Sequence, residues 1–175
     1  SGRGKLPDTP TLLWGIEKAL TEQDLAGRHV LVTAGPTQEA MDPVRFLSNH
    51  STGKMGYAIA ARAAMRGADA TLVSGPTALD TPHGVTRVDI VSARDMYDAV
   101  TSRAPEQDFI IKAAAVGDYR PAQTADEKLK KGDGEMNIEL TRNPDILAAL
   151  GKNKKPGQLL CGFAMETQNL LDNAE

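Results

Sequence analysis

Several residue classes are scarce in this chain, and each scarcity excludes a class of protein. Phe, Trp and Tyr together make up 4% of the 175 residues, so aromatic platforms for single-stranded nucleic acid are not expected. The one cysteine, Cys161, rules out an internal disulfide, fits a reducing cytosol and suits a core position better than a nucleophilic role. The three histidines, His29, His50 and His83, do not have the spacing of metal ligands.

Long apolar runs and a strongly signed charge are also lacking. No run approaches the roughly 18 residues of a membrane-spanning helix, and the first ten residues do not have the layout of a signal peptide. The net charge of −3 provides no basic field for nucleic acid or an anionic membrane. We therefore expect a cytoplasmic protein with no nucleic acid and no membrane among its partners.

The composition that remains is that of an ordinary globular domain. Hydrophobic residues make up 41% of the chain and charged residues 25%, and this length suffices for one well-buried core. Residues 1–10 are rich in Gly, Pro and charge, and we interpret them as a linker or a cloning remnant. Residues 11–175 are predicted to form a single domain, which begins with a short helix over 11–20 that docks through Trp14.

Short apolar runs alternate with helical patterns along the rest of the chain. The predicted strands cover residues 29–35, 69–76, 85–91, 108–116 and 158–164. The predicted helices cover residues 53–66, 92–104 and 143–151. Strands that are apolar almost throughout favour a parallel sheet covered on both faces. The predicted fold class is therefore α/β, with a doubly wound, mostly parallel, Rossmann-like sheet.

Cap residues mark the starts of two of these helices. Ser92, followed by Asp95 three residues later, predicts a capping box at residue 92. Asn143 is predicted to cap the last helix, with Pro144 at its first position and Gly151 at its end.

Residues 117–142 break the alternation and contain no convincing helical pattern. We interpret them as an exposed arm or hairpin inserted after the strand at 108–116, with a turn at 132–134 and a strand near 136–141. The arm carries Lys128, Lys130 and Lys131. These lysines form either a solvated face or a mobile set of cations that closes over a polyphosphate.

Glycine, proline and polar residues follow four of the predicted strands, at 35–37, 74–76, 117–119 and 162–163. Ligands of open parallel sheets bind at the carboxyl ends of the strands, so we predict a binding edge here, although Gly and Pro also simply turn a chain. The Gly-x-Gly-x-x-Gly fingerprint is absent after the first strand, which argues against an NAD(P)-dependent reductase. The Walker spacing also fails, because Ser48 and Met55 stand at two of its required positions.

Two further features are candidates for ligand binding. Ser51, Thr52, Gly53 and Lys54 are predicted to begin a helix with unpaired amides, which either cradle a phosphate or form a plain helix start. Asp118 directly follows a predicted strand, where a carboxylate can bind a base, a ribose or Mg²⁺.

Six segments, in order, resemble the phosphopantothenoylcysteine synthetase family, usually the C-terminal half of bacterial bifunctional coenzyme A biosynthesis flavoproteins. They are TAGPTQEAMDPVRFLSNHSTGKMGYAIA, TLVSGP, KAAAVGDYRP, EKLKK, RNPDIL and GFAMET. The resemblance implies that CTP activates the carboxylate of 4′-phosphopantothenate as an acyl-cytidylate and releases pyrophosphate. The amine of cysteine then attacks the acyl carbon and displaces CMP. Mg²⁺ is expected with the triphosphate.

The resemblance also implies roles for individual residues. Asn49 is expected to handle the acyl-cytidylate, and Lys128 is expected to be needed for its formation. The residues expected to contact the nucleotide are Lys112, Ala113, Ala114, Asp118, Lys128, Asn143, Pro144, Asp145, Ile146 and Phe163.

The sequence departs from the family pattern in two places. Gly117 replaces a commoner alanine, and the chain stops at ETQNLLDNAE, before a lysine-bearing helix and the closing structure that the family is expected to have. The synthetase domain is therefore expected to be incomplete at its C-terminus. FMN is expected only in a decarboxylase half elsewhere in a parent chain, and the family implies a homodimer. A nucleotide-binding regulatory or assembly module without catalysis is the alternative interpretation.

Overall fold

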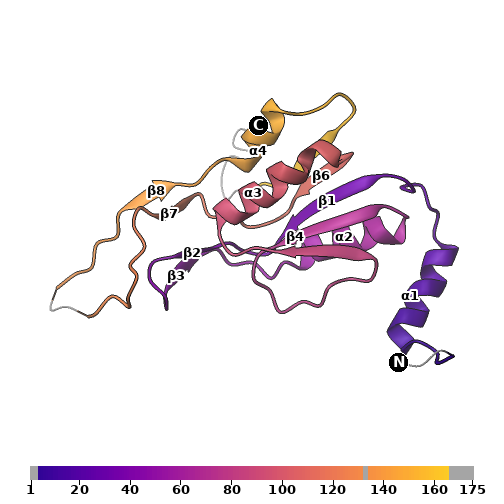
Figure 1. Cartoon of the computed structure of the whole chain (residues 1–175), viewed down its shortest axis with the longest axis horizontal. Helices are drawn as coiled ribbons and strands as arrows, with labels where there is room; N and C mark the ends of the chain where they lie inside the picture. The colour runs from indigo at the N-terminus through magenta and orange to yellow at the C-terminus, as the bar shows by residue number, and fades with distance from the viewer. Residues whose placement is uncertain (1–3, 132–133, 166–175) are drawn as a thin grey trace.

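Five parallel strands form the central sheet, in the order β5-β4-β1-β6-β9 (Figure 1). The computed structural model describes residues 4–131 and 134–165. The strands of the sheet are β1 (His29–Ala34), β4 (Asp69–Ser74), β5 (Val85–Asp89), β6 (Phe109–Lys112) and β9 (Leu159–Gly162). The strand order proceeds outward in both directions from the β1–β6 pair, so the predicted doubly wound parallel sheet is confirmed.

Helices cover both faces of the sheet. They are α2 (Lys54–Met65) on one face, and α3 (Ala93–Arg103) and α4 (Ile146–Lys152) on the other. A short 3-10 helix (Ala104–Glu106) follows α3.

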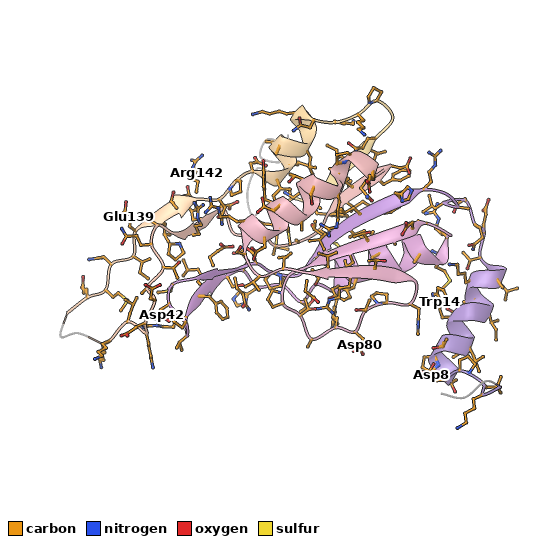
Figure 2. All side chains as sticks on the ribbon, in the orientation of Figure 1. Asp8, Trp14, Asp42, Asp80, Glu139 and Arg142 are labelled. Carbon is orange, nitrogen blue, oxygen red and sulfur yellow. The ribbon has the colours of Figure 1, made fainter. Side chains whose placement is uncertain are left out.

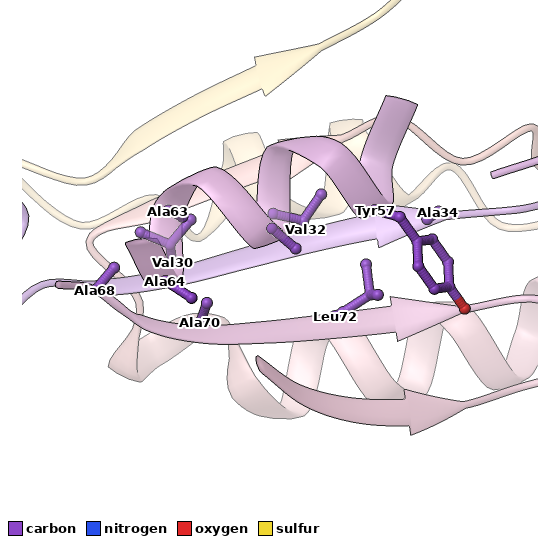
Figure 3. Close-up of a cluster of buried hydrophobic side chains, with 10 residues drawn as sticks. Val30, Val32, Ala34, Tyr57, Ala63, Ala64, Ala68, Ala70 and Leu72 are labelled. Carbon is purple, nitrogen blue, oxygen red and sulfur yellow. The ribbon is translucent and has the colours of Figure 1, made fainter. Parts of the chain in front are cut away.

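Successive residues of β1 pack into two separate hydrophobic cores, because the side chains of a strand alternate between the two faces of the sheet. Val30 and Val32 pack with the alanines of α2, as the cluster in Figure 3 shows. Leu31 packs instead with Met96 of α3 and Ile146 of α4. Full burial of each such side chain contributes about 1.5–3 kcal/mol to stability.

The N-terminal helix α1 (Thr9–Leu20) lies at the end of the molecule away from the later hairpins (Figure 1). It begins two residues earlier than predicted, because the Asp8 side chain accepts a hydrogen bond from the Thr11 amide and Pro10 is tolerated in a first turn. Its predicted anchor is confirmed: the Trp14 ring lies 5.7 Å from the His83 ring, between centroids.

The predicted capping box at the start of α3 is confirmed, with the Ser92 and Asp95 side chains each bonded to the other's backbone amide. The predicted start of α4 is wrong. Asp145, not Asn143, is the N-cap residue, because its carboxylate accepts a hydrogen bond from the Ala148 amide at 2.9 Å. Asn143 lies in the preceding loop, and the helix runs one residue past the predicted end at Gly151.

Two small antiparallel hairpins extend from one end of the sheet (Figure 1). The first, β2 (Gln38–Ala40) with β3 (Phe46–Ser48), was not predicted. The second, β7 (Tyr119–Pro121) with β8 (Leu140–Arg142), confirms that the arm leaves the sheet as a hairpin. The strand predicted at 136–141 is wrong in position, because β8 pairs only with the three residues of β7. The predicted turn at 132–134 lies mostly outside the described residues, as do residues 166–175 of the predicted domain.

Candidate functional site

A cavity of 390 Å³ lies at the carboxyl end of β6, beside the start of α4. It is lined by Lys112, by residues 116–119 and by residues 142–146. Its size falls within the range of about 300–1,000 Å³ that is common for small-molecule sites. Of the four strand ends predicted to form a binding edge, the one at 117–119 lines this cavity, while 35–37, 74–76 and 162–163 are not among its lining residues.

Hydrogen bonds between the loop after β1 and the loop after β6 hold one wall of this cavity in place. The Ala115 amide donates to the Gly35 carbonyl at 2.9 Å, and the Gly117 amide donates to the Thr37 hydroxyl at 2.9 Å. Thr37 is 1% exposed, so its hydroxyl is a buried acceptor with a fixed position. The loop after β6 is thus tied to the loop after β1, and its course at the cavity is set by that contact.

Asn143 joins the two sides of the cavity. Its side-chain amide donates to the Gly117 carbonyl at 2.8 Å, and its backbone amide donates to the Asp118 carbonyl at 2.8 Å. Its side-chain oxygen accepts a hydrogen bond from the Arg120 guanidinium at 3.1 Å. The polar groups of Asn143 therefore shape the site and do not cap α4, which explains why its predicted capping role failed.

Four charged residues line the cavity: Lys112, Arg142, Asp118 and Asp145. Burial lowers the pKa of the Lys112 ammonium group, and the nearby carboxylates of Asp145 and Asp118 offset part of that decrease. A partly buried lysine with a perturbed pKa at a cavity is a candidate contact for a ligand.

The cavity brings together many of the residues predicted from the sequence, namely Lys112, Asp118, Asn143, Pro144, Asp145 and Ile146. Others lie at its border. The Asn49 side-chain amide donates to the Val116 carbonyl at 3.1 Å, which places this exposed residue against the cavity wall. The Phe163 amide donates to the Lys112 carbonyl at 3.0 Å, although its ring is half-exposed. Ala113 and Ala114 follow β6, and the Ala114 amide donates to the Thr33 hydroxyl.

The remaining predicted residues do not line the cavity. Lys128 is exposed on the arm. Gly53 and Lys54 start α2, which packs on the opposite face of the sheet from α4. Gly53 has φ 75°, a left-handed conformation, and a side chain there would collide with Thr77. The predicted unpaired amides at this helix start are wrong in part, because the Gly53 amide donates to the Ser51 hydroxyl at 3.3 Å.

Sequence reasoning gave no role to Arg142, which lines the cavity from β8. Tyr119 of β7 also lines the cavity and lies within the binding edge predicted at 117–119. A second cavity of 650 Å³ shares Arg142, Asn143 and Pro144 with the first and is lined by residues of α3. The available signal for Arg142 was its place at the start of the segment RNPDIL, because a strand of three residues shows no periodicity.

The Lys112 charge generates a prediction about stability. Its pKa is lower in the folded chain than in the unfolded chain, so its charge destabilises the fold below the folded-state pKa, and this effect fades as the pH rises toward the unfolded value. We expect Lys112→Met to raise the urea concentration at the midpoint of unfolding at about pH 7. The difference in this midpoint between the variant and the unmodified protein should become smaller by about pH 10.

The control for this measurement is Lys154→Met, which removes an exposed lysine outside the cavity and should leave the midpoint unchanged at either pH. Equal midpoints for Lys112→Met and the unmodified protein at about pH 7 would contradict the stated origin of the shift.

Comparisons with known proteins agree with this architecture. Residues 25–175 match the family model for the DNA/pantothenate metabolism flavoprotein C-terminal domain. The coenzyme A biosynthesis bifunctional protein CoaBC of Haemophilus influenzae is 43% identical over 175 residues, which cover 99% of this chain and 44% of that protein. The corresponding protein of Bacillus subtilis (strain 168) is 48% identical over 173 residues, which cover 97% of this chain and 42% of that protein. The chain thus spans less than half the length of these relatives.

Solved structures are similar as well. The crystal structure of the C-terminal domain of a coenzyme A biosynthesis bifunctional protein CoaBC has a TM-score of 0.76 and 49% identity, covering 88% of this chain and 72% of that one. A Cab2 mutant in complex with phosphopantothenate-cysteine has a TM-score of 0.69 at 16% identity, covering 95% of this chain and 74% of that one, which shows a shared fold alone. By the extent of these matches, the chain belongs to the DNA/pantothenate metabolism flavoprotein C-terminal domain family.

Proposed function

We propose that this chain carries the site for CTP-dependent ligation of 4′-phosphopantothenate and cysteine. The products are phosphopantothenoylcysteine, CMP and pyrophosphate, in coenzyme A biosynthesis. The observation that carries the proposal is the cavity at the end of β6, where the segments that resemble the synthetase family converge on Lys112, Asp118 and residues 143–146. The similarity to CoaBC proteins, whose names assign them to coenzyme A biosynthesis, supports the same pathway.

The chemistry of the reaction explains why a nucleotide is needed. A carboxylate is a poor electrophile, so one of its oxygens first attacks the α-phosphorus of CTP, and pyrophosphate leaves. The amine of cysteine then attacks the acyl carbon of the mixed anhydride and loses a proton, and CMP leaves. Cations near the triphosphate stabilise charge that builds up in the first step. In this chain Lys112 in the cavity and Lys128 on the arm are our candidates for that task.

The proposed contacts follow the geometry of the cavity. Lys112 and Asp118 face the nucleotide, the segment 143–146 holds its cytidine end, and main-chain groups read the base. Ala113, Ala114 and Phe163 border this position, and Gly53 with Lys54 form a separate candidate phosphate contact at the start of α2. Asn49 is proposed to act on the acyl-cytidylate from the Val116 side of the wall.

Mg²⁺ is proposed to accompany the triphosphate. No cluster of three or more His, Cys, Asp or Glu side chains suited to a metal occurs within residues 4–131 and 134–165. Mg²⁺ at nucleotide sites usually takes one or two carboxylates together with substrate phosphates, so a preformed cluster is not required. The carboxylates of Asp118 and Asp145 in the cavity fit that requirement. When bound, the ion would neutralise triphosphate charge and leave the two ligation steps to the groups above.

The wider setting of the chain is also proposed. We assign residues 1–10 to a linker and residues 11–175 to one synthetase domain, with an FMN-dependent decarboxylase domain in the parent chain. We place the reaction in the cytoplasm, on the ground of the similarity to coenzyme A biosynthesis proteins. Among the described residues, none of the helices has the length and hydropathy of a membrane span.

Substrate dependence tests the proposed function. Pyrophosphate release by the purified protein should require CTP and 4′-phosphopantothenate together, because the carboxylate is the attacking group. A coupled pyrophosphate assay measures this, with ATP in place of CTP as the specificity control. Pyrophosphate release with ATP, and no release with CTP, would refute the assignment.

Calorimetry in the same preparation separates the alternative, a regulatory nucleotide-binding module. Such a module would bind CTP tightly in the absence of 4′-phosphopantothenate and would release no pyrophosphate.

The Asn49 side chain provides a second test. Asn49→Asp keeps the size of the side chain but loses the N–H group that now contacts the Val116 carbonyl. We expect activation to continue and the second step to slow by about a hundredfold or more, the loss typical when a positioned donor is removed. Acyl-cytidylate should then accumulate, which mass spectrometry of quenched reactions detects. Normal turnover without accumulation would contradict this role.

A homodimer is proposed to form through the two hairpins. Exposed apolar side chains gather on them, and those that we assign to the interface are Val44, Phe46, Met136, Ile138 and Leu140. The hairpins lie beside each other, since the Thr124 hydroxyl donates to the Ala40 carbonyl. Exposed apolar side chains that lie together mark association surfaces, and we propose that these five residues form one.

Ile138→Lys should weaken this dimer by at least about tenfold, because it puts a charge into the apolar contact. Sedimentation equilibrium measures the dissociation constant. The control is Leu20→Lys, which adds the same charge at an 83% exposed position on α1. An unchanged constant for Ile138→Lys, or a monomer at every concentration of the unmodified protein, would contradict the proposed interface.

A further inference from the structure

A buried carboxylate, Asp42, lies in the turn between β2 and β3 (Figure 2). Asp42 is not among the residues that line either cavity. Its side chain is inaccessible to solvent. One of its oxygens, Oδ1, accepts hydrogen bonds from the backbone amides of Val44 and Arg45, each at 2.8 Å. These two contacts close the turn and involve nothing outside it.

The other oxygen, Oδ2, reaches across to the arm. It accepts hydrogen bonds from Arg45 Nε at 2.9 Å, from Arg45 Nη2 at 2.6 Å and from the Leu129 amide at 3.1 Å. Arg45 Nη2 also donates to the Leu129 carbonyl at 2.7 Å. Asp42, Arg45 and Leu129 therefore form an arm anchor, in which both backbone groups of Leu129 are held by one ion pair.

The arm has other attachments, so the anchor has a local effect. The Ala125 amide donates to the Met41 carbonyl at 3.0 Å, and the Thr124 hydroxyl donates to the Ala40 carbonyl at 3.2 Å. These bonds keep the base of the arm in place independently of Asp42. The arm anchor binds the backbone of Leu129, the residue next to Lys128. The Lys128 side chain is exposed.

We propose that Asp42 is a positioning residue, which fixes the backbone beside Lys128 so that its ammonium group meets the triphosphate in the activation step. The inference rests on the proposed function of this site. An exposed lysine on an untethered arm would lose conformational entropy each time it met the substrate, and a tether at the adjacent residue removes much of that loss beforehand.

The ionised state of Asp42 suits this role. The Arg45 guanidinium, and the amides that bond to the carboxylate, hold the pKa of Asp42 far below its usual range. Protonation therefore does not release the arm anchor at any pH at which a ligase is assayed, and the oxygen facing Leu129 remains an acceptor.

Asp42→Asn tests the role of Oδ2 separately from that of Oδ1, because it replaces one of the two oxygens by an amide nitrogen. The remaining carbonyl oxygen can still close the turn, while the new amide group presents donors to the Arg45 and Leu129 donors. Hydrogen exchange at the Leu129 amide should speed up by at least about tenfold as its acceptor is lost. Single-turnover pyrophosphate release should slow by about tenfold or more, while CTP affinity changes by less than about threefold.

Lys128→Gln shows whether the effect passes through the lysine. If Asp42 acts by positioning Lys128, the double variant Asp42→Asn with Lys128→Gln should be no slower than Lys128→Gln alone. The matched control is Asp24→Asn, which removes a carboxylate that pairs with both Arg66 Nε and Nη2 on the α1 side of the molecule. That control should change neither the Leu129 exchange rate nor pyrophosphate release.

Leu129→Pro removes the same hydrogen bond from the arm and leaves the buried turn intact, so it serves if Asp42→Asn does not fold. It should slow pyrophosphate release as Asp42→Asn does. The inference is overturned if, in Asp42→Asn, the Leu129 amide exchanges faster while pyrophosphate release stays fast. It is also overturned if pyrophosphate release slows while the Leu129 exchange rate stays unchanged. Additive rates in the double variant also overturn it, because they indicate a purely structural role. No release from the unmodified protein would instead refute the proposed function, and this inference with it.

Discussion

The contact between the chain segments that leave β1 and β6 determines where every other part of the site lies. The register of the two strands sets Val30 opposite Phe109, and the pairing continues beyond the strands to a bridge between Pro36 and Ala115. The buried Thr37 hydroxyl then receives the Gly117 amide. Because this acceptor is fixed in the interior, the following residues, Asp118 and Tyr119, leave the sheet at a defined position and angle. The cavity and the arm both begin there.

Polar groups are buried in this region at some cost to stability. Thr37 and Asp42 are almost inaccessible, and each has its hydrogen-bonding capacity used by neighbouring chain segments. Lys112 differs from them, because the carboxylates of Asp118 and Asp145 offset only part of the effect of burial on its pKa. A lysine with a perturbed pKa at a cavity is the kind of residue that marks a functional site, which supports our proposal of an anionic ligand.

The two hairpins give this sheet properties that a plain doubly wound fold lacks. They bring Tyr119 and Arg142 to the cavity, and they carry the exposed apolar residues assigned to a dimer interface. The β2–β3 turn also holds the arm through Asp42. The two hairpins thus connect the cavity, the lysine-bearing arm and the proposed association surface.

The sequence alone determined the elements whose signal is local. The apolar strands and the capping box of Ser92 with Asp95 follow from periodicity and cap chemistry. The position of Asp118 directly after a strand indicated the edge at which the cavity lies, whereas Lys112 was expected only from the family resemblance. The tertiary structure decided that Asn143 bridges the cavity instead of capping α4, and that Asp42 meets Leu129, 87 positions away. Strands of three residues show no period, and contacts across such distances depend on the register of the sheet. For this reason no local pattern in the chain encodes them.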